Sequence, residues 1–180
     1  MASFFASSYF FLLLLVANIF NFQTCLCGII EDEAFITGIC RQVQDLSFCM
    51  TTFRKILHTH PYIPSDVTQA AITQSLANAN NNHAFIEAAK AKAKDKETQD
   101  LYTICDTGYG VLINELQESI QSLAKKDYTS LENSLSKCPR YVSDCQNALG
   151  DKTTPEMVDR SRKQFDLVLM AKVAESLIKK

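Results

Sequence analysis

Residues Leu101 to Leu123 read LYTICDTGYGVLINELQESIQSL, and this stretch decides the fold. Its small and apolar residues recur at steps of three and four, which is the spacing of one face of an α-helix. That face consists of Leu101, Cys105, Gly108, Leu112, Leu116, Ser119 and Leu123. Because a helix with one apolar face needs partners to bury it, the stretch predicts a helix packed against other helices.

The next stretch, residues 128–149, carries a second apolar face with the same spacing. That face consists of Tyr128, Leu131, Leu135, Cys138, Val142, Cys145 and Leu149. Lys125, Lys126 and Asp127 form a polar turn between the two stretches, and Asp127 is placed to cap the second helix. Pro139 removes one backbone hydrogen bond of that helix and predicts a kink.

An antiparallel arrangement of these two helices brings one pair of cysteines together. Residues equally far from a turn near Lys126 face each other, so Cys105 should meet Cys145. Cys138 is seven residues out of this register, roughly 10 Å at about 1.5 Å per residue, which is too far for a disulfide. We therefore predict a Cys105–Cys145 disulfide.

The composition is that of one helical domain. The chain has 180 residues, of which 47% are hydrophobic, with five Gly, four Pro and no Trp. Its formal net charge is only −2, which gives no indication of binding to nucleic acid or to an anionic membrane surface.

The first 28 residues contain no charged side chain, and residues 4–22 are almost wholly apolar. This pattern predicts a secretory signal peptide over residues 1–28, cleaved after Cys27 or Gly28, and a mature domain over residues 29–180. An uncleaved membrane anchor is the alternative, because the apolar run is nearly long enough to span a bilayer.

Cleavage leaves five cysteines, which in an exported chain indicate two disulfides and one spare thiol. On one straight helix Cys40 and Cys49 would stand roughly 13 Å apart, so the chain must reverse between them if they are bonded. Asp45 and Ser47 lie where that turn and a new helix start are needed. Residues 29–62 are therefore predicted to form a short helical hairpin.

Two further helices complete the prediction. Pro61 and Pro64 end the hairpin, and Ser65 or Asp66 is expected to cap a helix that runs to about residue 94. Its apolar face is predicted to hold Ile72, Leu76, Ala79, His83 and Ile86. The last helix is expected to be capped by Thr153 or Thr154, with Pro155 in its first turn. Its apolar face is predicted to hold Val158, Phe165, Leu169, Val173 and Leu177, with Met170 and Ala174 beside them.

The predicted fold is therefore all-α, an up-and-down four-helix bundle over residues 65–180 preceded by the short N-terminal helical hairpin. Within it, the run of asparagines at positions 78–82 is expected to weaken the middle of the first bundle helix.

Several spacings together resemble those of the plant invertase and pectin methylesterase inhibitor family, from about Ile29 onward. They are the cysteine pair separated by eight residues, Leu101-x3-Cys105-x3-Tyr109, Lys126-Asp127-Tyr128-x-Ser130, and the final Cys145. The resemblance implies a four-helix bundle with an N-terminal hairpin and export to the cell wall or the vacuole. It also implies disulfides Cys40–Cys49 and Cys105–Cys145, which leave Cys138 as the free thiol. Family members bind one carbohydrate-active enzyme one to one and block its active-site cleft.

The target enzyme is predicted from one motif. Some invertase inhibitors of the family carry Pro-Lys-Phe before the third bundle helix, whereas this sequence has Lys125, Lys126, Asp127 and Tyr128 there. Its absence favours pectin methylesterase slightly over acid invertase. These four residues are our hypothesis for the partner contact, with a solvated turn as the alternative.

No catalytic constellation is found in the sequence, so we predict neither an enzyme nor a cofactor. His58 and His60 do not share a helix face, and we predict no metal site there. His83 is predicted to be a packing residue. The alternative to an enzyme inhibitor is a secreted carrier that encloses a small ligand in an apolar cavity at the bundle centre.

Overall fold

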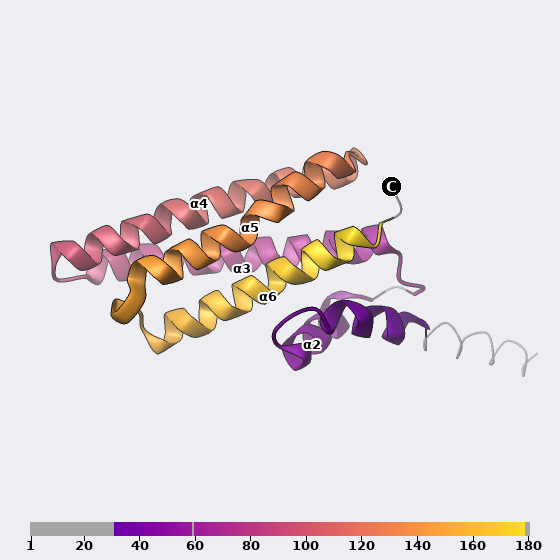
Figure 1. Cartoon of the computed structure of the whole chain (residues 1–180), viewed down its shortest axis with the longest axis horizontal. Helices are drawn as coiled ribbons and strands as arrows, with labels where there is room; N and C mark the ends of the chain where they lie inside the picture. The colour runs from indigo at the N-terminus through magenta and orange to yellow at the C-terminus, as the bar shows by residue number, and fades with distance from the viewer. Residues whose placement is uncertain (1–30, 59, 179–180) are drawn as a thin grey trace, which may run out of the picture.

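The computed structural model describes residues 31–58 and 60–178, so the predicted signal peptide lies outside the described residues. The main helices are α2 (Leu46–Ile56), α3 (Pro64–Lys92), α4 (Lys96–Ala124), α5 (Tyr128–Leu149) and α6 (Pro155–Ser176). Helices α3 to α6 alternate in direction and pack in a closed ring in which α3 contacts α4 and α6, and α5 contacts α4 and α6 (Figure 1). The predicted all-α bundle is confirmed.

Side-chain caps begin two of the bundle helices where the sequence predicted them. Asp127 accepts a hydrogen bond from the Ser130 N–H at 3.1 Å, and Thr154 accepts one from the Met157 N–H at 3.2 Å. The cap predicted for α3 is wrong, because this helix begins at Pro64 after an uncapped Ile63. Proline has no N–H to satisfy and its φ already suits a helix, so the first turn needs no side-chain cap.

Helices α4 and α5 pack through nearly the predicted faces. On α4, Tyr102 and Tyr109 are buried in place of Leu101 and Gly108, which are half-buried. Gly108 instead allows close approach of the helices, because a Cβ there would lie 3.4 Å from the Tyr141 carbonyl oxygen. The predicted face of α5 is buried throughout, apart from Tyr128 at its start, which is half-buried.

The face predicted for α6 is wrong at its two ends, whereas Phe165, Leu169 and Val173 are half-buried. Val158 and Leu177 are 45% and 39% exposed. Met170 and Ala174 are buried as predicted, and the other residues that α6 buries include Met157, Ser161, Gln164, Leu167, Val168 and Ala171. The fully buried Gln164 donates to the carbonyl and hydroxyl oxygens of Ser75 at 3.3 and 3.0 Å and accepts from Asn78 at 2.8 Å. Because polar groups of α6 meet polar groups of α3, apolar spacing alone misses this interface.

The structure corrects two predictions for α3 through its contacts with α6 and with α4. The helix runs unbroken through residues 78–82, because Asn78 and Asn82 bond to α6. His83 is not a packing residue of an apolar face: it is half-buried, and its Nε2 lies 2.7 Å from Asp106 Oδ1 on α4. The buried face of α3 is turned towards Ser75 and Asn82, which leaves His83 at the edge of the core.

The structure contains both disulfides of the predicted pairing. The Cα atoms of Cys105 and Cys145 lie 4.4 Å apart, and those of Cys40 and Cys49 lie 5.5 Å apart. Cys138 is a buried free thiol, and α5 continues past it through Pro139 as one helix. Burial raises the pKa of the Cys138 thiol to about 12, so it stays protonated and unreactive at neutral pH.

The N-terminal hairpin, made of helical residues 31–40 and α2, is fastened to α3 and α6 (Figure 1). Asp45 caps α2 through the Phe48 N–H and pairs with Arg162 of α6 at 2.7 Å. Asp166 of α6 accepts a hydrogen bond from the Gln44 N–H at 3.1 Å. Among the described residues, no helix combines the length and the apolarity that crossing a bilayer requires.

Candidate partner-binding surfaces

An apolar groove runs between α4 and α5 on the outside of the bundle. Ile104 and Val111 lie seven residues apart on α4, about two helical turns, and are 50% and 36% exposed. The groove has a volume of 350 Å³, and its lining consists of Thr103, Ile104, Thr107, Gly108, Val111, Tyr141 and Asp144. We call it the α4–α5 groove. The two exposed apolar side chains make this groove a candidate interaction surface.

The floor of this groove is held by covalent and ionic links between its two helices. Ile104 and Asp144 are direct chain neighbours of the disulfide-bonded Cys105 and Cys145. Farther along the same pair of helices, Lys137 bonds to Glu115 at 3.0 Å, and this hydrogen bond raises the pKa of Lys137. A surface fixed in this way loses little conformational freedom on binding.

The turn between α4 and α5 contains the four residues that the sequence suggests as a partner contact, Lys125 to Tyr128. Lys125 and Lys126 are exposed, and Lys126 has a φ of 58°. Tyr128 is half-buried and lines a cavity of 430 Å³ together with Ile63, Pro64, Ser65, Leu177 and Ile178. The structure therefore joins Tyr128 to residues from the hairpin junction and the end of α6, which the sequence analysis did not connect to it.

Asp127, the remaining one of these four residues, makes hydrogen bonds to Ser130 of α5. Its two carboxylate oxygens accept from the Ser130 N–H at 3.1 Å and from the Ser130 hydroxyl at 2.7 Å. These bonds lower the pKa of Asp127, which therefore stays ionised at mildly acidic pH. Its role in this structure is to begin α5.

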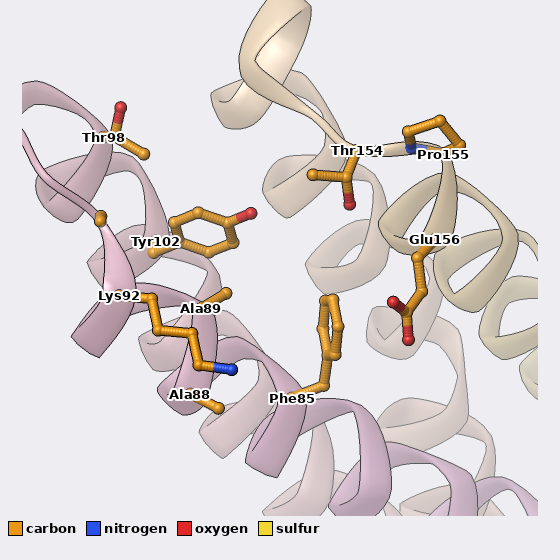
Figure 2. A pocket seen from close by; sticks show the side chains of 10 residues that line it. Phe85, Ala88, Ala89, Lys92, Thr98, Tyr102, Thr154, Pro155 and Glu156 are labelled. Atoms are coloured by element: carbon orange, nitrogen blue, oxygen red, sulfur yellow. The ribbon is translucent and has the colours of Figure 1, made fainter.

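A third hollow lies at the opposite end of the bundle, where the end of α3 meets the starts of α4 and α6 (Figure 2). It has a volume of 430 Å³ and is lined mainly by Phe85, Ala88, Ala89, Tyr102 and Pro155, with Lys92 and Glu156 also on its wall. The guanidinium of Arg160 lies 4.4 Å from the centre of the Phe85 ring. The bundle centre is occupied by fully buried side chains such as Leu112, Leu116, Leu131 and Leu135. This hollow is therefore a shallow end pocket, in contrast to the central cavity that the carrier hypothesis assumed.

The two histidines considered as metal ligands, His58 and His60, lie in different surroundings. His58 is exposed, whereas His60 Nδ1 lies 2.5 Å from Asp32 Oδ2. Asp32 also accepts a hydrogen bond from the Tyr62 N–H at 2.7 Å, so it links the first helix to the hairpin junction. The role of this pair is structural.

Comparison with known proteins identifies the family. The family profile described as "Plant invertase/pectin methylesterase inhibitor" matches residues 34–176, which is most of the chain. The chain belongs to this family. A curated inhibitor-family relative, "Pectinesterase inhibitor 5" of Arabidopsis thaliana, is 26% identical over 117 residues. That match covers 62% of this chain and 63% of the relative, so the chain spans less than two thirds of the length of the curated relative it matches.

Two solved structures of Arabidopsis pectin methylesterase inhibitors share the inhibitor fold. One, a mutant form, superposes with a TM-score of 0.73 over 81% of this chain and 97% of its own. The other, from Arabidopsis thaliana, gives a TM-score of 0.64 over 83% of this chain and 99% of its own. Both are 16% identical to this chain, so the likeness concerns the fold.

The α4–α5 groove contains the residues that sequence reasoning missed. Ile104 and Val111 are apolar and lie off the buried face of their helix, at a spacing of seven. A spacing of seven is about two helical turns, so these two residues lie on the same side of the helix, and this is the sequence signal that points to the groove. For this member of the inhibitor family, the groove and the Lys125–Tyr128 turn are the two candidate contact surfaces.

Proposed function

We propose that this chain is a secreted inhibitor of pectin methylesterase, which binds the enzyme one to one and covers its active-site cleft. The observation that carries this proposal is a rigid apolar surface, the α4–α5 groove, on a member of an inhibitor family. Family membership alone leaves invertase and pectin methylesterase as targets. The name of the curated relative and the missing Pro-Lys-Phe motif both favour pectin methylesterase.

The proposal also covers processing and localisation. Residues 1–28 act as the signal peptide, residues 29–180 form the mature inhibitor, and export delivers it to the cell wall, with the vacuole as the other destination. Two disulfides in the folded domain fit an oxidising, extracellular environment. The chain acts by binding and carries out no catalysis of its own.

The contact proposed first is the α4–α5 groove, because its exposed apolar residues stand on helices joined by a disulfide. An interface core of this kind combines apolar anchors with a low ordering cost on binding. The Lys125–Tyr128 turn is the second contact, with the two exposed lysines reaching the rim of the interface.

The decisive experiment titrates the purified, oxidised protein into pectin methylesterase and, separately, into acid invertase at mildly acidic pH. Residual activity of pectin methylesterase should fall in proportion to added protein and reach its minimum at one equivalent. Loss of invertase activity alone would reassign the target. If both enzymes keep full activity, the inhibitor proposal fails, and an apolar ligand in the end pocket becomes the leading hypothesis.

Two surface variants then locate the contact. Ile104→Asp places a charge in the α4–α5 groove and should weaken inhibition by roughly 10-fold or more, the loss expected for a central interface residue. Val158→Asp is the matched control, because Val158 is a β-branched apolar residue of similar exposure, at 45%, on α6 and outside the groove. Lys126→Glu tests the turn in the same assay. Equal inhibition by Ile104→Asp and Val158→Asp would exclude the groove.

A further inference from the structure

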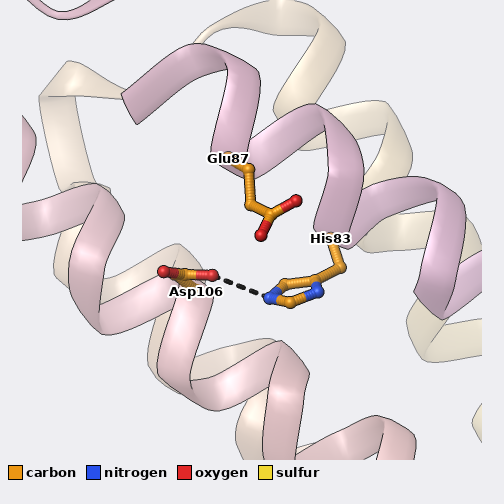
Figure 3. A group of neighbouring side chains, drawn as sticks. All are labelled: His83, Glu87 and Asp106. Atoms are coloured by element: carbon orange, nitrogen blue, oxygen red, sulfur yellow. Dashed lines mark hydrogen bonds and ion pairs between the residues drawn. The ribbon is translucent and has the colours of Figure 1, made fainter. Parts of the chain in front are cut away.

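Three potential metal ligands meet where α3 packs against α4. His83 and Glu87 are four residues apart on α3 and therefore lie on the same side of that helix, while Asp106 comes from α4. One donor atom from each residue lies within 4.8 Å of the other two. Figure 3 shows the Glu87 carboxylate directed towards the space between the other two side chains.

The donor atoms are accessible and chemically matched. His83 Nε2 faces Asp106 Oδ1 at 2.7 Å, and both residues are half-buried, whereas Glu87 is exposed. One imidazole nitrogen and two carboxylate oxygens form a ligand set that suits Zn²⁺, with water in the remaining position. Bonds of about 2.0–2.2 Å place neighbouring ligand atoms roughly 3.3 Å apart, so side-chain rotation alone would form the site.

From this geometry we propose that His83, Glu87 and Asp106 form a binding site for one Zn²⁺ ion that links α3 to α4. The metal replaces the present hydrogen bond between His83 Nε2 and Asp106 Oδ1. The inference is independent of the proposed inhibitor function.

Lys90 of α3 contacts the carboxylate that the proposed metal would also bind. Its Nζ donates to Asp106 Oδ2 at 2.9 Å, which leaves Oδ1 for the metal and fixes the carboxylate. The positive charge of Lys90 also opposes a cation, so its removal should strengthen metal binding.

The test is a Zn²⁺ titration of the oxidised, tag-free protein by isothermal calorimetry, without thiol reductant. We expect one ion per chain and a rise in melting temperature of roughly 2–4 °C when Zn²⁺ is in excess. His83→Ala should lower the affinity at least about 10-fold, because the loss of even an outer-shell partner of a metal ligand costs roughly 10- to 100-fold. Lys90→Gln keeps a donor to Asp106 without the charge and should raise the affinity.

His58→Ala is the matched control, because it removes an exposed histidine far along the chain from this cluster. It should leave the zinc affinity unchanged. The proposal is overturned if the protein takes up no Zn²⁺, if His83→Ala binds as tightly as the parent protein, or if His58→Ala abolishes binding.

Discussion

At the scale of single residues, Gln164 shows how a polar side chain can belong to the core. Its amide donates a hydrogen bond to the Ser75 hydroxyl and accepts one from the Asn78 amide inside the α3–α6 interface. Gln164→Leu leaves those groups unpaired, so we expect the free energy of unfolding to fall by about 1–3 kcal/mol, as measured by urea denaturation. The control Gln121→Leu changes an exposed residue on α4 and should stay within about 0.5 kcal/mol of the parent protein. Equal stability of the two variants would contradict the assigned role.

The residues that the sequence predicted well have partners close by in the chain. Asp127 and Thr154 cap helices through N–H groups three residues ahead, so their role is visible in a short window. His83 and Gln164 have partners 23 and 86 residues away, at Asp106 and Asn78. The packing of whole helices creates those contacts, and apolar periodicity carries no information on them.

At the scale of elements, the two disulfides should differ in what they stabilise. Loop-closure entropy gives about 3.9 kcal/mol for the Cys105–Cys145 loop and about 2.7 kcal/mol for the shorter Cys40–Cys49 loop. The double variant Cys105→Ala/Cys145→Ala should therefore lose more stability in guanidinium unfolding than Cys40→Ala/Cys49→Ala. The reverse order would show that native-state packing, instead of loop length, governs both links.

The sequence predicted the buried face of a helix well where apolar residues recur along that face without a break. The α4 and α5 faces carry enough apolar residues to set the antiparallel register, and that register alone predicted the pairing of Cys105 with Cys145. The prediction for α6 was incomplete, because its buried face includes Ser161 and Gln164 while Val158 lies at the surface. A buried face that contains both polar and apolar side chains can be predicted only when its polar partners on α3 are known.

At the scale of the whole molecule, the ring of helices divides the surface into two sides. Within residues 31–58 and 60–178, the N-terminal hairpin packs on α3 and α6, and it leaves the outer face of the α4–α5 pair uncovered (Figure 1). The α4–α5 groove lies on this uncovered side. The sequence predicted the bundle and the hairpin but not where the hairpin sits, and therefore could not show which helix pair is open to a partner.

The charge distribution of the whole molecule determines how it tolerates acid. Hydrogen bonds and ion pairs lower the pKa of Asp45, Asp95, Asp106, Asp127 and Asp159. A lowered pKa in the folded state contributes stability above the unfolded value of about 3.9 and loses it as the pH falls through the folded value. We expect a nearly constant melting temperature from about pH 7 to pH 5 and a decline below about pH 4.

Asp166 differs from these five aspartates, because its pKa is raised, and it can therefore be used to test this account of pH dependence. Burial raises its pKa, despite the hydrogen bond from the Gln44 N–H and the nearby charge of Arg162. A carboxyl group with a raised folded pKa costs stability when it is ionised, and the cost disappears as the pH falls through that pKa. Asp166→Asn keeps an oxygen acceptor for Gln44 without the charge.

This variant should therefore melt roughly 2–4 °C above the parent protein at pH 7, and the difference should shrink as the pH approaches 4. Melting curves followed by circular dichroism across this pH range measure the difference directly. Asp151→Asn, at an exposed position after α5, is the control and should follow the parent at every pH. A constant gap between Asp166→Asn and the parent down to pH 3 would mean that the charge of Asp166 is not what the substitution relieves. If the difference in melting temperature disappears towards pH 4, the carboxylate of Asp166 is a buried charge that lowers the stability of the fold.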